Sequence, residues 1–152
     1  MTDFTHLDRA GRASMVDIAE KAVTHRVATA RAFVRMAPET LLAIRDGHIH
    51  KGEVLHVARL AGVMASKRTD ELIPLCHTLG LEKIAVQFLL LPDDQMVAIE
   101  ATASLHGKTG VEMEAMVAVQ AAALTLYDMC KGRDRSMVLE HAHLYFKSGG
   151  RS

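Results

Sequence analysis

The 152-residue sequence has no tryptophan, only two tyrosines, four phenylalanines and two cysteines, and its formal net charge is zero. A protein that coats nucleic acid normally has a basic excess, and a surface for single-stranded RNA needs aromatic side chains, so both classes are disfavoured. No apolar run approaches the roughly 20 residues of a membrane span, and we find no secretory signal. The cysteines, Cys76 and Cys130, predict a reducing, cytoplasmic setting without a structural disulfide.

What the sequence does contain is typical of one soluble globular domain. Apolar residues make up 49% of the chain and charged residues 24%, and this length is sufficient to bury a sizeable core. We therefore expect a single domain over residues 1–152. Residues 1–13 and 148–152 are expected to be mobile, because their composition is polar or rich in glycine.

The spacing of apolar residues predicts an α+β fold. Two apolar runs flank the turn sequence Pro92-Asp93-Asp94-Gln95 and predict a β-hairpin. Strands are expected at about 26–36, 81–91, 96–106 and 137–146, and helices at 38–47, 52–68 and 109–129. This order predicts an antiparallel sheet with helices packed on one face, close to the ferredoxin-like order.

The segment Thr109-Gly110-Val111-Glu112 has the best helix-start signal in the chain. It matches a capping box, in which Thr109 and Glu112 would satisfy each other's backbone N–H groups, so we assign Glu112 a structural role. Gly107-Lys108-Thr109 resembles the end of a P-loop, but Thr102 stands where that motif requires glycine. A helix N-terminus beside a lysine nevertheless predicts an anion site.

Asp128 and Lys131 stand three residues apart at the end of the longest helical pattern. On a helix they share one face, where a carboxylate and an amine can tune each other's pKa and take part in proton transfer. On spacing alone, a surface ion pair is the ordinary alternative.

Histidine and cysteine motifs have simpler interpretations than catalysis. His48-Ile49-His50 and His141-Ala142-His143 would each place two imidazoles on one face of a strand, but a metal site needs three or four ligands, so no metal site is predicted. Cys76 and His77 are neighbours in sequence, and adjacent residues rarely face each other as a nucleophile and base must.

Several motifs in order together resemble the cyclic pyranopterin monophosphate synthases, the molybdenum cofactor biosynthesis protein C family. The two densest are Lys67 to His77, and Gly107 to Glu114 running on to Tyr127-Asp128-Met129-Cys130-Lys131. The others are Thr5-His6, Met15-Val16-Asp17, Met36, Pro38-Glu39-Thr40, Lys51-Gly52, Ala58-Arg59, Ala61-Gly62 and Lys147-Ser148-Gly149-Gly150. Three features depart from the family pattern: Glu53 replaces an aspartate, Thr78 replaces a proline, and the C-terminal tail is short.

The resemblance implies a lyase that converts 3',8-cyclo-7,8-dihydro-GTP to cyclic pyranopterin monophosphate and pyrophosphate in molybdenum cofactor biosynthesis. It implies that Lys51 and Lys131 act as acid and base, in an order left open, and that Asp128 orients Lys131. The residues it implies for substrate binding are Arg26, Lys67, His77 and Lys147 at the triphosphate, and Leu75, Cys76, Met113 and Glu114 around the rest of the substrate. No cofactor is required, and Mg²⁺ could accompany the pyrophosphate.

Helix lengths divide these residues into two groups. Lys51 and Lys67 would lie about 24 Å apart along one helix, and Glu114 and Asp128 about 21 Å apart along another. A pocket that uses both groups must therefore be built from two subunits. This agrees with the assembly that the resemblance implies, a homohexamer of three dimers with active sites between subunits. The two groups are Lys51, Asp128 and Lys131 at one end, and Lys67, His77, Met113 and Glu114 at the other.

Two other functions stay open at this point. An oligomeric α+β protein could hold a nucleotide without chemistry, as regulatory domains do. A nucleic-acid-binding protein would need a steep salt dependence of affinity, which the neutral charge disfavours.

Overall fold

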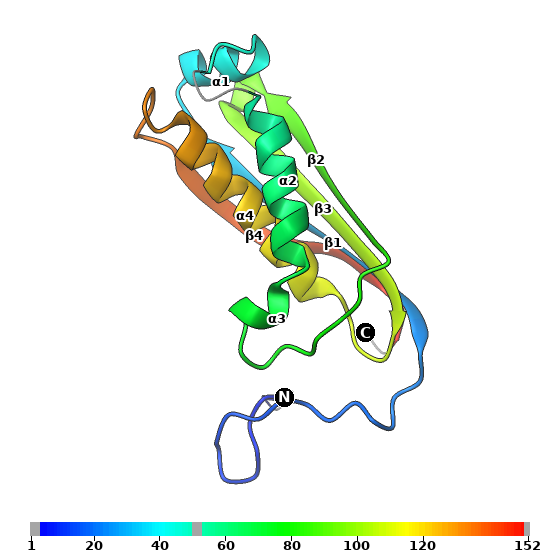
Figure 1. Cartoon of the computed structure of the whole chain (residues 1–152). Coiled ribbons are helices and arrows are strands. Elements are labelled where there is room, and N and C mark those ends of the chain that lie inside the picture. Colours follow the sequence, from blue (N-terminus) through cyan, green and yellow to red (C-terminus); the bar gives the residue numbers. More distant parts are fainter. Residues whose placement is uncertain (1–3, 50–52, 151–152) are drawn as a thin grey trace.

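The computed structural model describes residues 4–49 and 53–150 and consists of one sheet covered by helices (Figure 1). The strands are β1 (Thr24–Arg35), β2 (Lys83–Leu91), β3 (Met96–Gly107) and β4 (Val138–Ser148). The helices are α1 (Pro38–Arg45), α2 (Val54–Ser66), α3 (Thr69–Leu72) and α4 (Glu112–Cys130), with a 3₁₀ turn at Pro92–Asp94.

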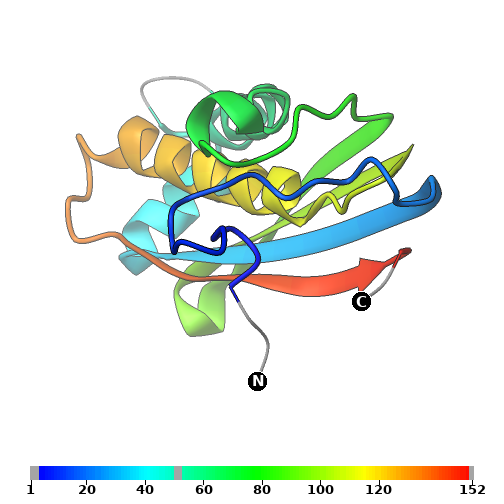
Figure 2. The same cartoon turned by 90° about the horizontal axis from the view of Figure 1, so that it is seen from below.

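The four strands lie in the spatial order β2-β3-β1-β4, and each neighbouring pair is antiparallel. Helices α2 and α4 cover one face of this sheet (Figure 2). The α+β fold, the antiparallel sheet and the placement of helices on one face are confirmed. The ferredoxin-like order stays a prediction.

Small side chains bring α4 close to the sheet. Ala28 and Ala30 on β1 and Ala101 and Ala103 on β3 are fully buried, as alternation along a strand requires for the covered face. On α4, Ala115, Ala118 and Ala122 are fully buried as well, and Ala118 and Ala122 also border Gly62 of α2. Because none of these side chains extends beyond a methyl group, the helix axis can approach the strands closely.

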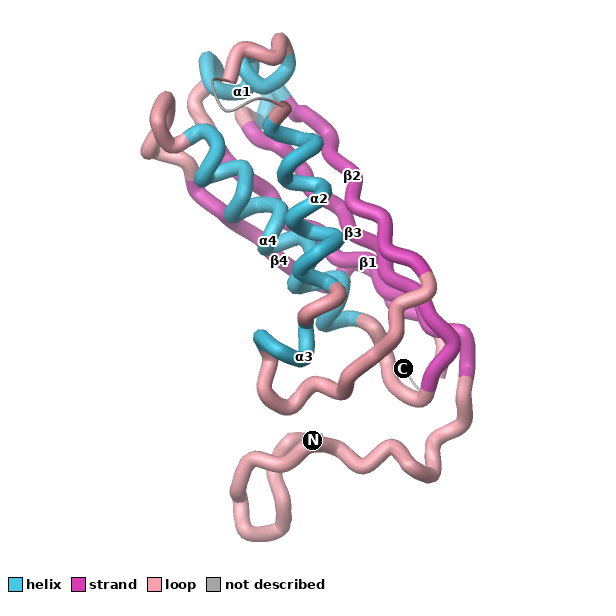
Figure 3. Tube along the Cα trace, viewed as in Figure 1, coloured by secondary structure: helices cyan, strands magenta, loops and turns pink. Residues whose placement is uncertain are grey.

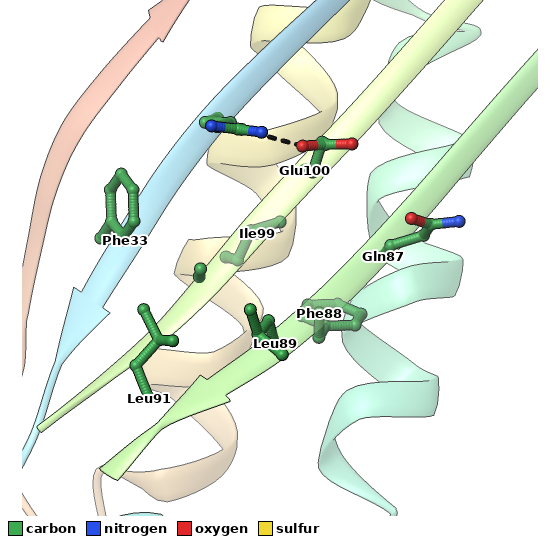
Figure 4. A pocket seen from close by; sticks show the side chains of 9 residues that line it. Phe33, Gln87, Phe88, Leu89, Leu91, Ile99 and Glu100 are labelled. Carbon is green, nitrogen blue, oxygen red and sulfur yellow. Dashed lines mark hydrogen bonds and ion pairs between the residues drawn. The ribbon is translucent and has the colours of Figure 1, made fainter. Parts of the chain in front are cut away.

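The opposite face of the sheet is open and carries both apolar and charged side chains. A cavity of about 450 Å³ on this face is lined by Phe33, Leu89, Leu91 and the Arg31–Glu100 ion pair, among others (Figure 4). The Arg31 guanidinium also lies 3.4 Å from the centre of the Tyr145 ring. None of the predicted site residues lines this cavity.

Residues 4–23 form a long loop beyond α3, which then leads into β1 (Figure 3). This loop contacts the rest of the described chain through Lys108, which donates to the Ala19 carbonyl, and through His77, whose Nε2 atom lies 2.6 Å from the Val16 carbonyl oxygen. Within the described ranges, no helix is both long and apolar enough to cross a membrane. Cys76 and Cys130 are free thiols.

Candidate functional site

Helices α2 and α4 are both continuous, so the predicted site residues lie at two distant ends of the molecule. α4 runs unbroken for 19 residues from Glu112 to Cys130, which places Glu114 and Asp128 about 21 Å apart. α2 is likewise unbroken over 13 residues, and Lys67 follows it directly. The Glu114 region and the Asp128 region of one subunit therefore cannot both contact the same reacting centre.

The first end of the molecule is built around Glu114, which is only 4% exposed. Burial raises the pKa of Glu114 to about 7; its backbone hydrogen bond lowers the pKa, and the nearby carboxylates of Glu112 and Asp70 raise it further. A carboxyl group with this pKa can hold or release a proton near neutral pH. It could therefore donate a hydrogen bond to a substrate or accept one.

Cys76 belongs to the same end, because its thiol is within electrostatic range of Glu114, Glu112 and Asp70. Burial and then these three carboxylates raise the pKa of the Cys76 thiol, so the thiolate is disfavoured. The thiol is consequently suited to lining a site and poorly suited to acting as a nucleophile. Thr78, which replaces the proline of the family pattern, donates a hydrogen bond of 2.8 Å to Asp70.

The predicted capping box at Thr109 is wrong. α4 begins at Glu112 with Val111 as its N-cap residue, and no side chain caps it. The Glu112 carboxylate instead folds back over Gly110, where a β-carbon would collide with it, and its Oε1 atom accepts a hydrogen bond of 3.3 Å from Lys147. Its Oε2 atom is buried and has no hydrogen-bond partner in the described part of the chain.

Glu112 therefore contacts a predicted site residue, Lys147, whereas sequence reasoning assigned it only a structural role. Its contact with Lys147 joins the start of α4 to the end of β4, two segments 35 residues apart. The available signal was the pair of acids Glu112 and Glu114 beside a predicted anion-binding helix start. The capping-box pattern concealed it, because that pattern depends on where the helix begins.

Arg26 contributes a buried positive charge to this end. It is 7% exposed, its Nε atom donates to the Gly107 carbonyl at 2.9 Å, and its guanidinium lies against Gly150. No carboxylate among the residues that the structure describes forms an ion pair with it. A buried guanidinium that no carboxylate of the described residues neutralises is a favourable site for an anion.

A cavity of about 540 Å³ opens beside Arg26 and includes Lys21, Thr24 and Gly150 in its lining. The Thr24 hydroxyl is buried, and within residues 4–49 and 53–150 it has no hydrogen-bond partner. Unlike the cavity on the open face of the sheet, this cavity contains a predicted site residue.

The second end of the molecule contains the Asp128–Lys131 pair. The Oδ1 atom of Asp128 and the Nζ atom of Lys131 are 2.9 Å apart, and the two side chains are 56% and 50% exposed. An ion pair this exposed contributes little to stability in one subunit. Lys51, predicted to join this pair, lies outside the described residues.

The structure places the remaining predicted residues at the Glu114 end or close to it. Met113 is next to Glu114 in the first turn of α4, and Leu75 and His77 flank Cys76 in the loop after α3. Lys67 is exposed at the end of α2 that leads into α3. Across the described ranges, no group of three or more His, Cys, Asp or Glu residues could hold a metal ion.

Comparison with known proteins gives a consistent result. Residues 15–150 match the MoaC family. A cyclic pyranopterin monophosphate synthase of Chloroflexus aurantiacus is 57% identical over 150 residues, which cover 99% of this chain and 92% of the relative. One from Desulforapulum autotrophicum is 55% identical over 152 residues, which cover 100% of this chain and 93% of the relative. The chain therefore belongs to the MoaC family.

Proposed function

We propose that this protein is a cyclic pyranopterin monophosphate synthase, a lyase of molybdenum cofactor biosynthesis. Its substrate would be 3',8-cyclo-7,8-dihydro-GTP, and its products cyclic pyranopterin monophosphate and pyrophosphate. The observation that carries the proposal is 57% identity, over 99% of the chain, to a relative with this name. The chemistry at the two ends of the molecule supports the proposal.

The Asp128–Lys131 pair supplies the proton chemistry in this proposal. Opening the five-membered purine ring and rebuilding it as a pterin requires protons to be removed and delivered, and Lys51 and Lys131 are the proposed acid and base. Asp128 lies 2.9 Å from the Lys131 amine and is placed to orient it. Which lysine is the acid follows from single-turnover analysis of the two alanine variants.

The Glu114 end binds the substrate in this proposal. Arg26, Lys67, His77 and Lys147 would contact the triphosphate and stabilise the departing pyrophosphate, and the buried Arg26 guanidinium is the best placed of these. The residues proposed to surround the rest of the substrate are Leu75, Cys76, Met113 and Glu114. Mg²⁺ would enter, where needed, with the pyrophosphate.

Both ends reach one substrate only if two subunits share each site. The half-exposed Asp128–Lys131 pair supports this, because a neighbouring subunit could cover it and exclude water. We propose a homohexamer of three dimers in the cytoplasm. Its active sites would lie between subunits.

The test of this function is incubation of the protein with the cyclised GTP intermediate, followed by mass analysis for the pterin and for pyrophosphate. Formation of both products is expected. A nucleotide-binding module without chemistry would instead form no product, while a Lys51→Ala, Lys131→Ala double variant kept its affinity for the nucleotide.

The triphosphate role has a separate test. Arg26→Ala and Lys67→Ala should weaken binding of the triphosphate substrate much more than binding of an analogue without phosphates, because each removes a cation that only the phosphates contact. Calorimetric titration of both ligands measures the difference. Equal losses for the two ligands would assign these cations to folding or to the base.

A further inference from the structure

The turn after α4 contains a buried carboxylate that binds a distant segment of the chain. Asp134 is 8% exposed. Its Oδ2 atom accepts hydrogen bonds of 2.9 Å from the Ala37 backbone N–H and from the Thr40 hydroxyl. Its Oδ1 atom accepts hydrogen bonds from the backbone N–H and the hydroxyl of Ser136. Each carboxylate oxygen of Asp134 therefore accepts two hydrogen bonds.

Asp134 is held in its ionised form. Burial by itself would raise its pKa, but hydrogen bonds from Ser136, Ala37 and Thr40 outweigh burial and lower the pKa of Asp134 to about 2. The charge lies at the first turn of α1, where backbone N–H groups lack helical partners and the helix dipole is positive. The N-cap residue of α1, Ala37, has no side chain that could cap the helix. Asp134, 97 residues away in the sequence, instead accepts the hydrogen bond from the Ala37 N–H.

A second contact joins the same turn to the other end of α1. The Arg133 guanidinium donates to the His48 carbonyl at 3.4 Å, just beyond the end of that helix. Within the turn, the N–H groups of Arg133 and Asp134 both donate to the Cys130 carbonyl, and the Lys131 N–H donates to Tyr127. The segment from the last turn of α4 to Asp134 is therefore held by its own backbone hydrogen bonds, and it contacts both ends of α1.

We propose that Asp134 is a positioning residue for the Asp128–Lys131 pair, because it fixes the last turn of α4 against the first turn of α1. This inference rests on the proposed function, in which the Lys131 amine transfers a proton. Displacement of a reacting group by about 1 Å can cost on the order of a hundredfold in rate. The hydrogen bonds of Asp134 to α1 limit such displacement at the end of α4, so we expect them to affect turnover. The Asp128 and Lys131 side chains are half exposed, so little packing within the subunit fixes their positions. Their positions therefore depend mainly on the backbone that carries them.

Asp134→Asn tests the proposal, because it keeps the shape of the side chain and replaces one acceptor oxygen with a donor. We expect kcat to fall by about tenfold to a hundredfold. KM should stay within about twofold, because the residues proposed to bind the triphosphate lie at the Glu114 end of the molecule, away from Asp134. Arg133→Ala removes only the exposed contact to His48 and should lower kcat less, with an unchanged melting temperature.

Val86→Ala is the matched control, since Val86 is a 3%-exposed core residue of β2, a strand that pairs with β3 and packs against α2. It should lower the melting temperature and leave kcat unchanged well below that temperature. Hydrogen exchange provides a readout that needs no turnover. The N–H groups of Lys131 and Asp134 should exchange faster in Asp134→Asn than in the parent, and at the parental rate in Val86→Ala.

Unchanged kcat in folded Asp134→Asn, or a kcat loss that Val86→Ala reproduces, would overturn the proposal. If Asp134→Asn does not fold, Thr40→Val decides, because it removes one hydrogen bond between Asp134 and the first turn of α1. Parental kcat in folded Thr40→Val would overturn the proposal. A parent protein that forms no product contradicts the proposed function instead. In that case, unchanged hydrogen exchange of the Lys131 and Asp134 N–H groups in Asp134→Asn would show that Asp134 does not hold the last turn of α4 against α1.

Discussion

Glu112 and Glu114 occupy the same helix turn and have different environments. Glu112 accepts a hydrogen bond from Lys147, whereas Glu114 is buried with its pKa raised to about 7. Sequence reasoning could place Glu114 in the site through resemblance. It could not separate the two roles, because burial and the approach of β4 are set by the tertiary fold.

The raised pKa of Glu114 predicts a pH-dependent stability. Below about pH 4.5 both states hold the proton, so the group contributes nothing. Between about pH 4.5 and 7 the unfolded carboxyl releases its proton and the folded one keeps it, so stability falls as pH rises. Relative to Glu114→Gln, the parent should lose about 3 kcal/mol of unfolding free energy across this window.

Urea unfolding of the parent and of Glu114→Gln at several pH values measures this difference. It should grow as pH rises through the window and level off above about pH 7. A difference that does not vary with pH would mean that Glu114 ionises in the folded protein as it does in the unfolded chain.

Asp128→Asn should keep the fold and lose nearly all turnover. The amide removes the negative charge 2.9 Å from the Lys131 amine, and we expect a loss of about 3 kcal/mol of transition-state stabilisation. Because both side chains are half exposed, the melting temperature should barely change. Steady-state kinetics and thermal unfolding check the two expectations, and activity within a few-fold of the parent would remove Asp128 from the mechanism.

At the scale of elements, α2 and α4 pack closely together at Gly62. A β-carbon added there would lie 2.9 Å from the Ala118 carbonyl oxygen and 3.2 Å from the Val86 side chain. The carbonyl belongs to the backbone of α4 and cannot move without shifting the helix. Glycine at this position therefore sets the distance between the two helices.

Gly62→Ala should destabilise the protein by about 1 to 3 kcal/mol, because the added methyl group forces the helices apart. Gly80→Ala is the matched control: it adds the same group where nothing lies within 4 Å, and it should be close to neutral. Chemical denaturation of the two variants makes the comparison. Equal effects would show that the α2–α4 contact tolerates a side chain.

Sequence patterns predicted the long elements well, because each strand and helix buries one face. The helix expected at 52–68 is α2 at Val54–Ser66, and the hairpin expected around Pro92–Asp94 joins β2 to β3. The four-residue helix α3 was not predicted, since one helical turn carries no periodicity. The start of α4 was wrong by three residues, because its first turn is fixed by a contact to β4 that no local pattern contains.

At the scale of the whole molecule, the proposed assembly would bring apolar surface side chains against a neighbouring subunit. Several large apolar side chains are exposed in separate elements, among them Leu60 and Met64 on α2 and Leu144 and Phe146 on the edge strand β4. In the proposed assembly, a neighbouring subunit would cover side chains of this kind. In the proposed function, contact between subunits is needed for catalysis, because the two site regions of one subunit are separated by the length of α4.

Shared sites predict that two inactive variants rescue each other. If each pocket takes Asp128 and Lys131 from one subunit and Lys67 from its neighbour, a mixed dimer of Lys67→Ala and Asp128→Ala has one pocket with both lesions and one with neither. Random exchange makes half of the dimers mixed, each with one intact site of two, so about a quarter of parental activity should return because the dimer interface is isologous.

The control for this rescue mixes Asp128→Ala with Lys131→Ala. Both lesions lie in the same group, 2.9 Å apart in the folded chain, so every pocket of a mixed dimer keeps one of them and no activity should return. Native mass spectrometry of isotope-labelled subunits establishes that exchange has occurred. If exchange is complete and the Lys67→Ala mixture stays inactive, the sites are not shared between these two groups. Since α4 is unbroken from Glu112 to Cys130, Lys67 or Asp128 must then act outside the pocket where the chemistry takes place.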